Sequence, residues 1–174
     1  MLAAARAARA AGGVTILNAA PIRPLPAELL DELDVLIVNE HEARELGRER
    51  GIGAADDSAL AVALTALVPL VLVTLGSDGV IVAVRDREPA SAPAFRVRAV
   101  DTTGAGDTFC GAFAARLAAE GADRSDPETP GSGAIAAPSG VSGSTMLPAS
   151  ILTVCAASAA GTSSKTAAVM STCS

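Results

Sequence analysis

The sequence predicts an α/β domain built on a mostly parallel sheet flanked by helices, and three observations support this prediction. Helical and strand-like patterns alternate from residue 1 to about residue 121. Strand-like segments such as DVLIVN (34–39) are apolar without interruption, which is typical of parallel strands covered on both faces. The chain of 174 residues is also long enough for one domain with a substantial core.

The first half of this pattern contains three expected helices and two expected strands. An Ala/Arg helix ends at Gly12-Gly13, and β-branched residues then predict a strand in VTILN (14–18). A proline-rich turn leads to a short helix, AELLDEL (27–33), whose leucines share one face. The strand 34–39 follows, and we expect the next helix, EHEARELG, to stop at its final glycine, Gly47.

The second half continues the alternation. A helix over 56–67 opens with Asp-Asp-Ser, which are residues typical of helix starts. LVLVTLG (70–76) and GVIVAV (79–84) read as two strands joined by a hairpin-like turn. AFRVRAV (94–100) alternates like a further strand, and an apolar helix is expected over 106–121.

Composition changes after Gly121, so we divide the chain at that residue. Residues 122–174 are rich in Ser, Thr, Gly, Pro and Ala and show no sustained helical or strand period. Such a segment can bury little apolar surface, and we expect it to be mostly disordered. Its abrupt loss of pattern suggests a shifted reading frame. We therefore expect a structured part over 1–121 and an irregular tail over 122–174.

Charge and composition exclude several classes of partner. The formal net charge is −6 and no stretch is dense in Lys or Arg, which argues against nucleic acid and anionic membranes as partners. The apolar run 61–76 is shorter than a membrane-spanning helix and is interrupted by Pro69. Three scattered cysteines form no disulfide framework or zinc motif and fit a reducing cytoplasm.

The segment DTTGAGDTF (101–109) is the strongest candidate for chemistry. A strand-like segment precedes it and a helical pattern follows, so Gly104, Ala105 and Gly106 would lie at a helix start. The first amides of a helix have no internal partner and attract anions, and glycine permits close approach of a ligand. A carboxylate at Asp107 could then take a proton from an attacking hydroxyl in phosphoryl transfer. The alternative for GAGD alone is an ordinary capped helix.

DTTGAGDTFCGAF resembles the signature of the PfkB-type carbohydrate kinases, and two further segments, residues 14–47 and VLVTLGSDGV, match the family in order and spacing. The resemblance covers about residues 1–121 and implies a Rossmann-type layered fold truncated to the second half of the family's domain. It implies ATP-dependent phosphorylation of a sugar hydroxyl, with ribose as the first candidate. Asp107 would be the general base and contact the sugar, and the amides of Gly104, Ala105 and Gly106 would form the anion hole.

The resemblance also assigns nucleotide and metal contacts. Within NEHE, Asn39 would contact nucleotide phosphates and Glu42 would organise Mg²⁺ through water, although the same spacing is that of a helix capping box. The family's nucleotide-binding turn corresponds to Thr74, Leu75, Gly76, Ser77, Asp78 and Gly79, which could equally be a hairpin turn alone. Gly106 and Asp107 would also lie against the nucleotide.

Asp101 and Thr103 resemble positions of a monovalent-cation site, for which K⁺ is the candidate ion. The alternative is that these residues simply end a strand. His41 reads as an exposed helix residue and not as a ligand. The resemblance further implies a cytoplasmic enzyme whose partners are a small sugar and ATP, and a homodimer for the complete protein.

Two departures from the family limit these expectations. A complete member of the family is one domain of about 300 residues. The half of that domain that carries the sugar pocket is absent here. The tail after Gly121 does not match the family's adenine-binding segment. Three alternatives therefore stay open: another carbohydrate or nucleoside kinase of the family, a non-catalytic fragment, and a dinucleotide-binding oxidoreductase. The last would need a third glycine that GAGD lacks.

Overall fold

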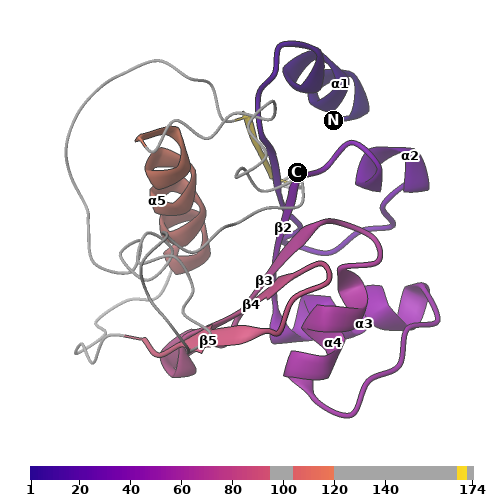
Figure 1. Ribbon diagram of the computed structural model, residues 1–174, viewed down its shortest axis with the longest axis vertical. Helices are drawn as coiled ribbons and strands as arrows, with labels where there is room; N and C mark the ends of the chain where they lie inside the picture. Colours follow the sequence, from indigo (N-terminus) through magenta and orange to yellow (C-terminus); the bar gives the residue numbers. More distant parts are fainter. Residues whose placement is uncertain (95–103, 120–167, 172–174) are drawn as a thin grey trace.

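The computed structural model describes residues 1–94, 104–119 and 168–171 (Figure 1). Its helices are α1 (Leu2–Ala10), α2 (Ala27–Leu30), α3 (Glu40–Glu49), α4 (Asp57–Leu64) and α5 (Ala105–Ala119). Its strands are β1 (Thr15–Asn18), β2 (Val35–Asn39), β3 (Leu70–Thr74), β4 (Val80–Val84), β5 (Ala90–Ala92) and β6 (Ala168–Ser171). None of the helices in this described part is long and apolar enough to cross a membrane.

The strands form one sheet in the order β5-β4-β3-β2-β1-β6. β1, β2 and β3 are parallel neighbours, and β6 is parallel to β1. β4 and β5 are antiparallel additions at the other edge. The predicted α/β class with a mostly parallel sheet is therefore confirmed, as is the hairpin between β3 and β4.

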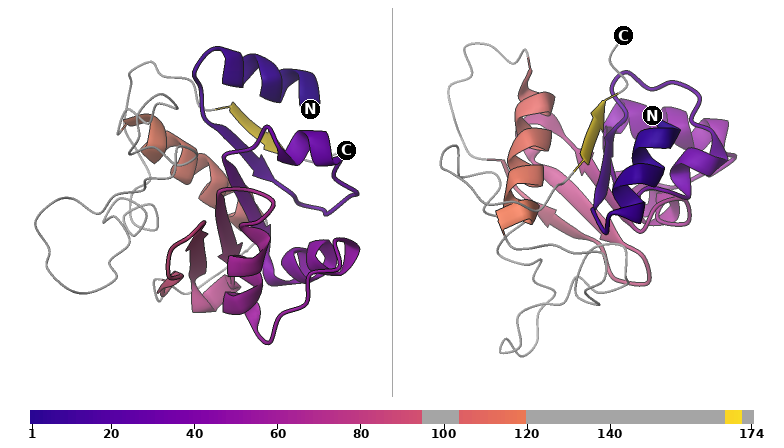
Figure 2. Two further views of the ribbon diagram at one scale, coloured as in Figure 1. Left: turned by 45° about the vertical axis from the view of Figure 1, so that its right-hand side comes forward. Right: turned by 90° about the horizontal axis from the view of Figure 1, so that it is seen from above.

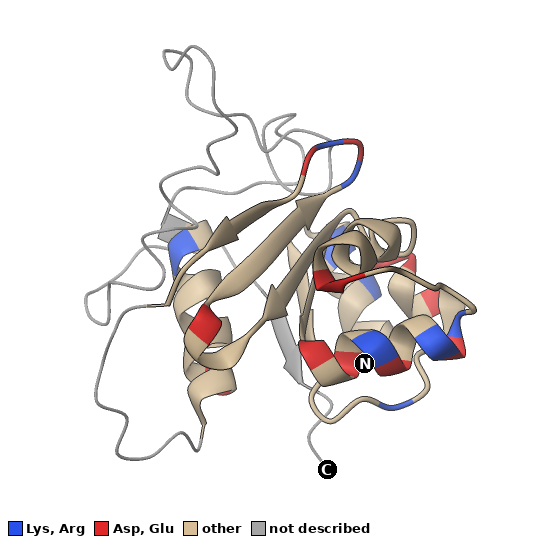
Figure 3. Ribbon diagram, turned by 90° about the horizontal axis from the view of Figure 1, so that it is seen from below, with Lys and Arg blue, Asp and Glu red and all other residues tan. Residues whose placement is uncertain are grey.

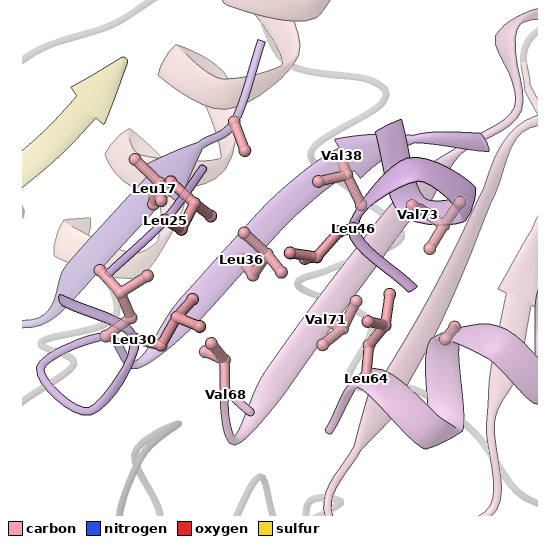
Figure 4. Close-up of a cluster of buried hydrophobic side chains, with 14 of the residues drawn as sticks. Leu17, Leu25, Leu30, Leu36, Val38, Leu46, Leu64, Val68, Val71 and Val73 are labelled. Atoms are coloured by element: carbon pink, nitrogen blue, oxygen red, sulfur yellow. The ribbon is translucent and has the colours of Figure 1, made fainter. Parts of the chain in front are cut away.

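Helices cover both faces of this sheet, but unequally (Figure 2). α1, α2, α3 and α4 lie on one face, where their leucines and alanines pack against the alternate strand residues that include Leu17, Leu36 and Val71 (Figure 4). α5 lies on the opposite face, where Phe113 is buried against the remaining strand residues, such as Ile16 and Ile37. Each central strand buries the side chains on both of its faces, which explains its uninterrupted apolar sequence.

Charged residues lie on the helices and loops and not on the strands of the sheet. Figure 3 shows acidic and basic residues on the helices of the four-helix face and on the loop after β4, while the strands are free of charge. α5 carries only Asp107 and Arg116 as charged residues in its 15 positions. The carboxylate at the start of α5 therefore has no charged neighbour on its own helix within the first turns.

Several predicted boundaries differ from the structure. α3 does not stop at Gly47 but continues to Glu49, and the positive φ of +68° at Gly51 follows its end. Gly47 instead lies inside the helix. A Cβ at this position would approach the Ile52 carbonyl oxygen and a Leu60 methyl to 3.0 Å. Close packing against the next segment is therefore the reason for this glycine.

Two strands were not predicted. β5 contains only small residues and pairs with the outer edge of β4. β6 falls within the tail that we expected to be mostly disordered, and it pairs with the outer edge of β1. Several predictions lie outside the described residues: the strand over 94–100 except its first residue, and the end of the last helix at Gly121. The division of the chain at residue 121 and the rest of the tail also lie outside them.

Candidate active site

Three parallel strands end in polar residues on the face that α5 covers. These residues are Asn18 of β1, Asn39 of β2 and Thr74 of β3. Side chains alternate along a strand, so each lies on the same face as the apolar residue two positions earlier. Those earlier residues belong to the cluster beneath α5: Ile16, Ile37 and Leu72. The carboxyl edge of the sheet thus changes from apolar to polar on the α5 face.

The amino end of α5 carries the predicted anion-binding turn. Gly104 has φ +76°, a left-handed conformation that favours glycine, and its carbonyl oxygen accepts the first helical bond from the Thr108 amide at 2.9 Å. The amides of Ala105, Gly106 and Asp107 have no acceptor within the helix. All four residues are exposed, and a Cβ at Gly106 would meet no described atom within 4 Å. Among the described residues, the turn therefore has room for a ligand.

Asp107 connects this turn to the end of the sheet. The side-chain nitrogen of Asn18 donates to Oδ1 of Asp107 at 3.5 Å, across a sequence separation of 89 residues. The contact places the start of α5 at the carboxyl edge of the parallel strands, the edge at which α/β sheets bind ligands. Asn18 was not among the predicted site residues. The signal for it was a polar residue closing an otherwise apolar strand.

Asn39 and Glu42 form the capping box that the sequence allowed. Oδ1 of Asn39 accepts from the Glu42 amide, and Glu42 Oε2 accepts from the Asn39 amide, both at 2.9 Å. Glu42 is 7% exposed, and this burial raises the pKa of its carboxyl above the ordinary value, partly offset by the Asn39 amide and by His41. His41 is exposed and pairs with Glu45, so its prediction as a surface residue is confirmed.

The Thr74–Gly79 segment forms a tight turn between β3 and β4. Gly76–Asp78 make a single 3₁₀ turn, in which the Asp78 amide donates to the Leu75 carbonyl at 3.0 Å. The Leu75 amide donates to the Gly79 carbonyl at 2.8 Å and closes the loop between the two strands. The Thr74 hydroxyl donates to the Val38 carbonyl at 3.4 Å. Ser77 and Asp78 are exposed at the tip. The hairpin interpretation is thus confirmed, and it leaves the hydroxyls and amides of this turn at the same sheet edge as Asn39.

Cys110 lies in the second turn of α5. Its thiol is buried, and its pKa is raised to about 11, first by burial and then by the charges of Asp107 and, more weakly, Glu42. Both carboxylates therefore act on the same buried atom although they come from different helices.

The predicted metal ligands do not form a site among the described residues. Asp101 and Thr103, the candidate K⁺ ligands, lie outside them. Within the part of the chain that the structure places, no group of three or more His, Cys, Asp or Glu side chains could hold a metal ion. A separate groove on the four-helix face contains none of the predicted site residues; it is lined by Ile22, Arg23, Pro24, Glu45, Arg48 and Glu49.

Residues 1–136 match the pfkB family of carbohydrate kinases. The chain belongs to this family. A ribokinase of Staphylococcus aureus (strain COL) is 38% identical over 121 residues, which span 67% of this chain and 38% of that relative. A ribokinase of Bacillus subtilis (strain 168) is 46% identical over 109 residues, which span 62% of this chain and 33% of that relative. The chain thus spans about a third of the length of these two curated relatives.

Solved structures give the same picture. The ribokinase of Arabidopsis thaliana complexed with ribose and ATP is similar at a TM-score of 0.59 and 34% identity, covering 71% of this chain and 40% of that structure. The ribokinase of Thermotoga maritima is similar at a TM-score of 0.58 and 36% identity, covering 67% of this chain and 39% of that structure. The expected resemblance and fold are therefore confirmed, and the oxidoreductase alternative loses its support.

Proposed function

We propose that this chain carries the nucleotide-binding and catalytic part of an ATP-dependent kinase that phosphorylates ribose to ribose 5-phosphate. One observation carries the proposal: Asp107 stands exposed in the first turn of α5, within hydrogen-bond distance of Asn18 at the polar end of β1. A carboxylate and a row of amides that have no acceptor within α5 then lie together at the exposed start of this helix. Membership of a carbohydrate kinase family supports phosphoryl transfer as the reaction class.

Asp107 would act as the general base on the sugar hydroxyl. The acceptor oxygen bonds to the γ-phosphorus of ATP while the bond from that phosphorus to the β–γ bridging oxygen breaks and ADP leaves. The hydroxyl proton passes to the Asp107 carboxylate. The amides of Gly104, Ala105 and Gly106 would donate to the phosphoryl oxygens, where negative charge must be held.

The nucleotide would lie along the carboxyl edge of β2 and β3. Asn39 uses Oδ1 for the helix cap, which leaves its side-chain NH₂ as a possible donor to phosphate. The turn from Thr74 to Gly79 would hold the rest of the nucleotide through its hydroxyls and backbone amides. Gly106 and Asp107 would complete the phosphate contacts from the opposite side.

The donor set fits Mg²⁺ better as a partner of the nucleotide than as a resident ion. Mg²⁺ keeps several waters and is bound through one or two carboxylates together with substrate phosphates. Glu42 offers one buried carboxylate beside the phosphate-facing end of α3, where Oε2 is engaged by the cap. Mg²⁺ would neutralise phosphate charge there, and Glu42 would orient its waters. We also propose K⁺ binding at Asp101 and Thr103, on the family resemblance alone.

Two alternatives have specific support. A fructokinase of Zea mays is 39% identical over 87 residues, and an Anopheles gambiae adenosine kinase structure is similar at a TM-score of 0.61 and 29% identity. Either substrate class would use the same base and anion hole. A non-catalytic fragment is supported by the short coverage of the relatives. We further propose a cytoplasmic location and, for a complete enzyme, a homodimer.

The test is phosphate transfer by the purified full chain. Because the half that carries the family's sugar pocket is absent from this chain, turnover should be slow. We expect slow ADP formation with Mg·ATP and ribose, still slower turnover with fructose or adenosine, and a loss of about 10²–10⁴-fold in Asp107→Asn. Asp86→Asn is the matched control, because Asp86 is an exposed aspartate in the loop at the other edge of the sheet. Equal turnover in both variants would contradict the role of Asp107. Binding of Mg·ATP without any turnover would favour the non-catalytic fragment.

A further inference from the structure

Asn18 is a buried polar side chain at the end of an apolar row. Val14, just before β1, and Ile16 and Asn18 of β1 are exposed by only 2%, 0% and 6%. Val14 and Ile16 belong to the apolar cluster beneath α5. An amide buried at this position loses its water, and burial of a polar group is costly unless it finds a partner. The partner is Asp107.

Asp107, in contrast, is exposed and has few constraints of its own. The other charged residue of α5, Arg116, lies more than two turns away along the helix. An exposed aspartate in a first helical turn can occupy several rotamers. The donor from Asn18 reaches Oδ1 at 3.5 Å, which is long for a hydrogen bond, and such contacts tighten when substrate binds.

We propose that Asn18 is a positioning residue for the catalytic carboxylate. Its amide holds Oδ1 of Asp107, so that Oδ2 is directed to the acceptor hydroxyl. The role requires a donor without charge: a carboxylate at position 18 would repel Asp107, and an apolar side chain would leave it unrestrained. The proposal rests on the proposed function, because the orientation matters only if Asp107 takes a proton.

Kinetics separate positioning from a structural role. In Asn18→Leu, a variant of similar size without a donor, we expect kcat to fall about 10–100-fold while KM for ATP changes less than about twofold. Asn18→Asp should lose at least as much at neutral pH. Ile16→Val is the matched control: it lies on the same strand and face, should lower Tm, and should leave kcat unchanged. Parallel losses in kcat and Tm for all three variants would overturn the proposal.

A second measurement does not depend on turnover. We expect the side-chain NH₂ resonances of Asn18 in the full chain to move in Asp107→Ala, which alters an exposed residue and so preserves the fold. They should stay in place in Asp78→Ala, which removes the carboxylate at the tip of the β3–β4 turn. Unmoved resonances in Asp107→Ala overturn the proposal. If the wild-type chain transfers no phosphate, the proposed function fails, and this measurement alone decides whether Asn18 holds Asp107.

Discussion

Gly79, at the end of the proposed nucleotide-binding turn, offers the sharpest test of the fold around the site. Its φ of +106° with ψ of −133° is a conformation that glycine adopts almost alone. The backbone of the following edge segment also presses against it. A Cβ at Gly79 would lie 2.0 Å from the Ala92 carbonyl oxygen and 2.8 Å from both the Pro93 Cα and the Ala94 nitrogen. Gly79→Ala should therefore be strongly destabilising.

Two contributions set the magnitude of the loss. The backbone conformation costs a side chain about 1–3 kcal/mol. The Ala92 oxygen must also withdraw by about 1.4 Å to reach ordinary contact, which detaches β5 from β4. Because β5 is a three-residue edge strand, its release limits this contribution to about two or three hydrogen bonds of about 1 kcal/mol each. We expect a total loss of about 3–6 kcal/mol in the free energy of unfolding.

Gly76→Ala is the matched control in the same turn. Its φ of +57° is also left-handed, but a Cβ there meets nothing within 4 Å, so we expect a loss of only about 1–2 kcal/mol. Urea denaturation followed by circular dichroism measures both values. Equal losses in the two variants would refute the reasoning, because the contact with Ala92 would then contribute nothing.

Three further predictions concern the interior of the site. Burial raises the pKa of Glu42, so ionisation of this carboxyl opposes folding at pH values above its unfolded pKa. Glu42→Gln keeps the cap and should therefore have a higher Tm than wild type at pH 7. This advantage should disappear as the pH falls towards 4.5. A widening gap in acid would contradict this. Phe113→Ala should lower the free energy of unfolding by about 3–5 kcal/mol in urea denaturation, and Phe109→Ala, at a half-buried ring, should lower it clearly less. A larger loss in Phe109→Ala would contradict the position of α5 on the sheet. With the other two cysteines replaced by serine, Cys110 should react with a disulfide reagent at pH 8 at least about a hundredfold slower than a free thiol, because its pKa is about 11. Rapid labelling of the native chain would contradict its burial.

The sequence was sufficient to predict most of the central architecture. An uninterrupted apolar run identified β2 as a parallel strand and β3 as a strand, and the GAGD turn located the start of α5 within one residue. Local signals are strong in these segments because each strand is buried on both faces and the helix opens on glycine. The capping box at Asn39 was also visible, since it depends on residues only three positions apart.

The features that were missed depend on contacts distant in the sequence. β5 has a composition of small residues with no strand pattern, and it forms because Gly79 lets the chain approach the open edge of β4. Gly47 looked like a helix end, but its role is close packing against Leu60 in the next helix. Asn18 acquires its partner across 89 residues. No local pattern encodes which side chain will stand opposite it.

The central claim is that the carboxyl edge of the sheet and the amino end of α5 bind nucleotide phosphates together. Titration of the full chain with Mg·ADP, followed through its backbone amide resonances, tests this most directly. We predict saturable shifts concentrated at residues 104–107 and 74–79. Saturable shifts confined to the groove beside Arg48, or no saturable shifts at all, would contradict the account.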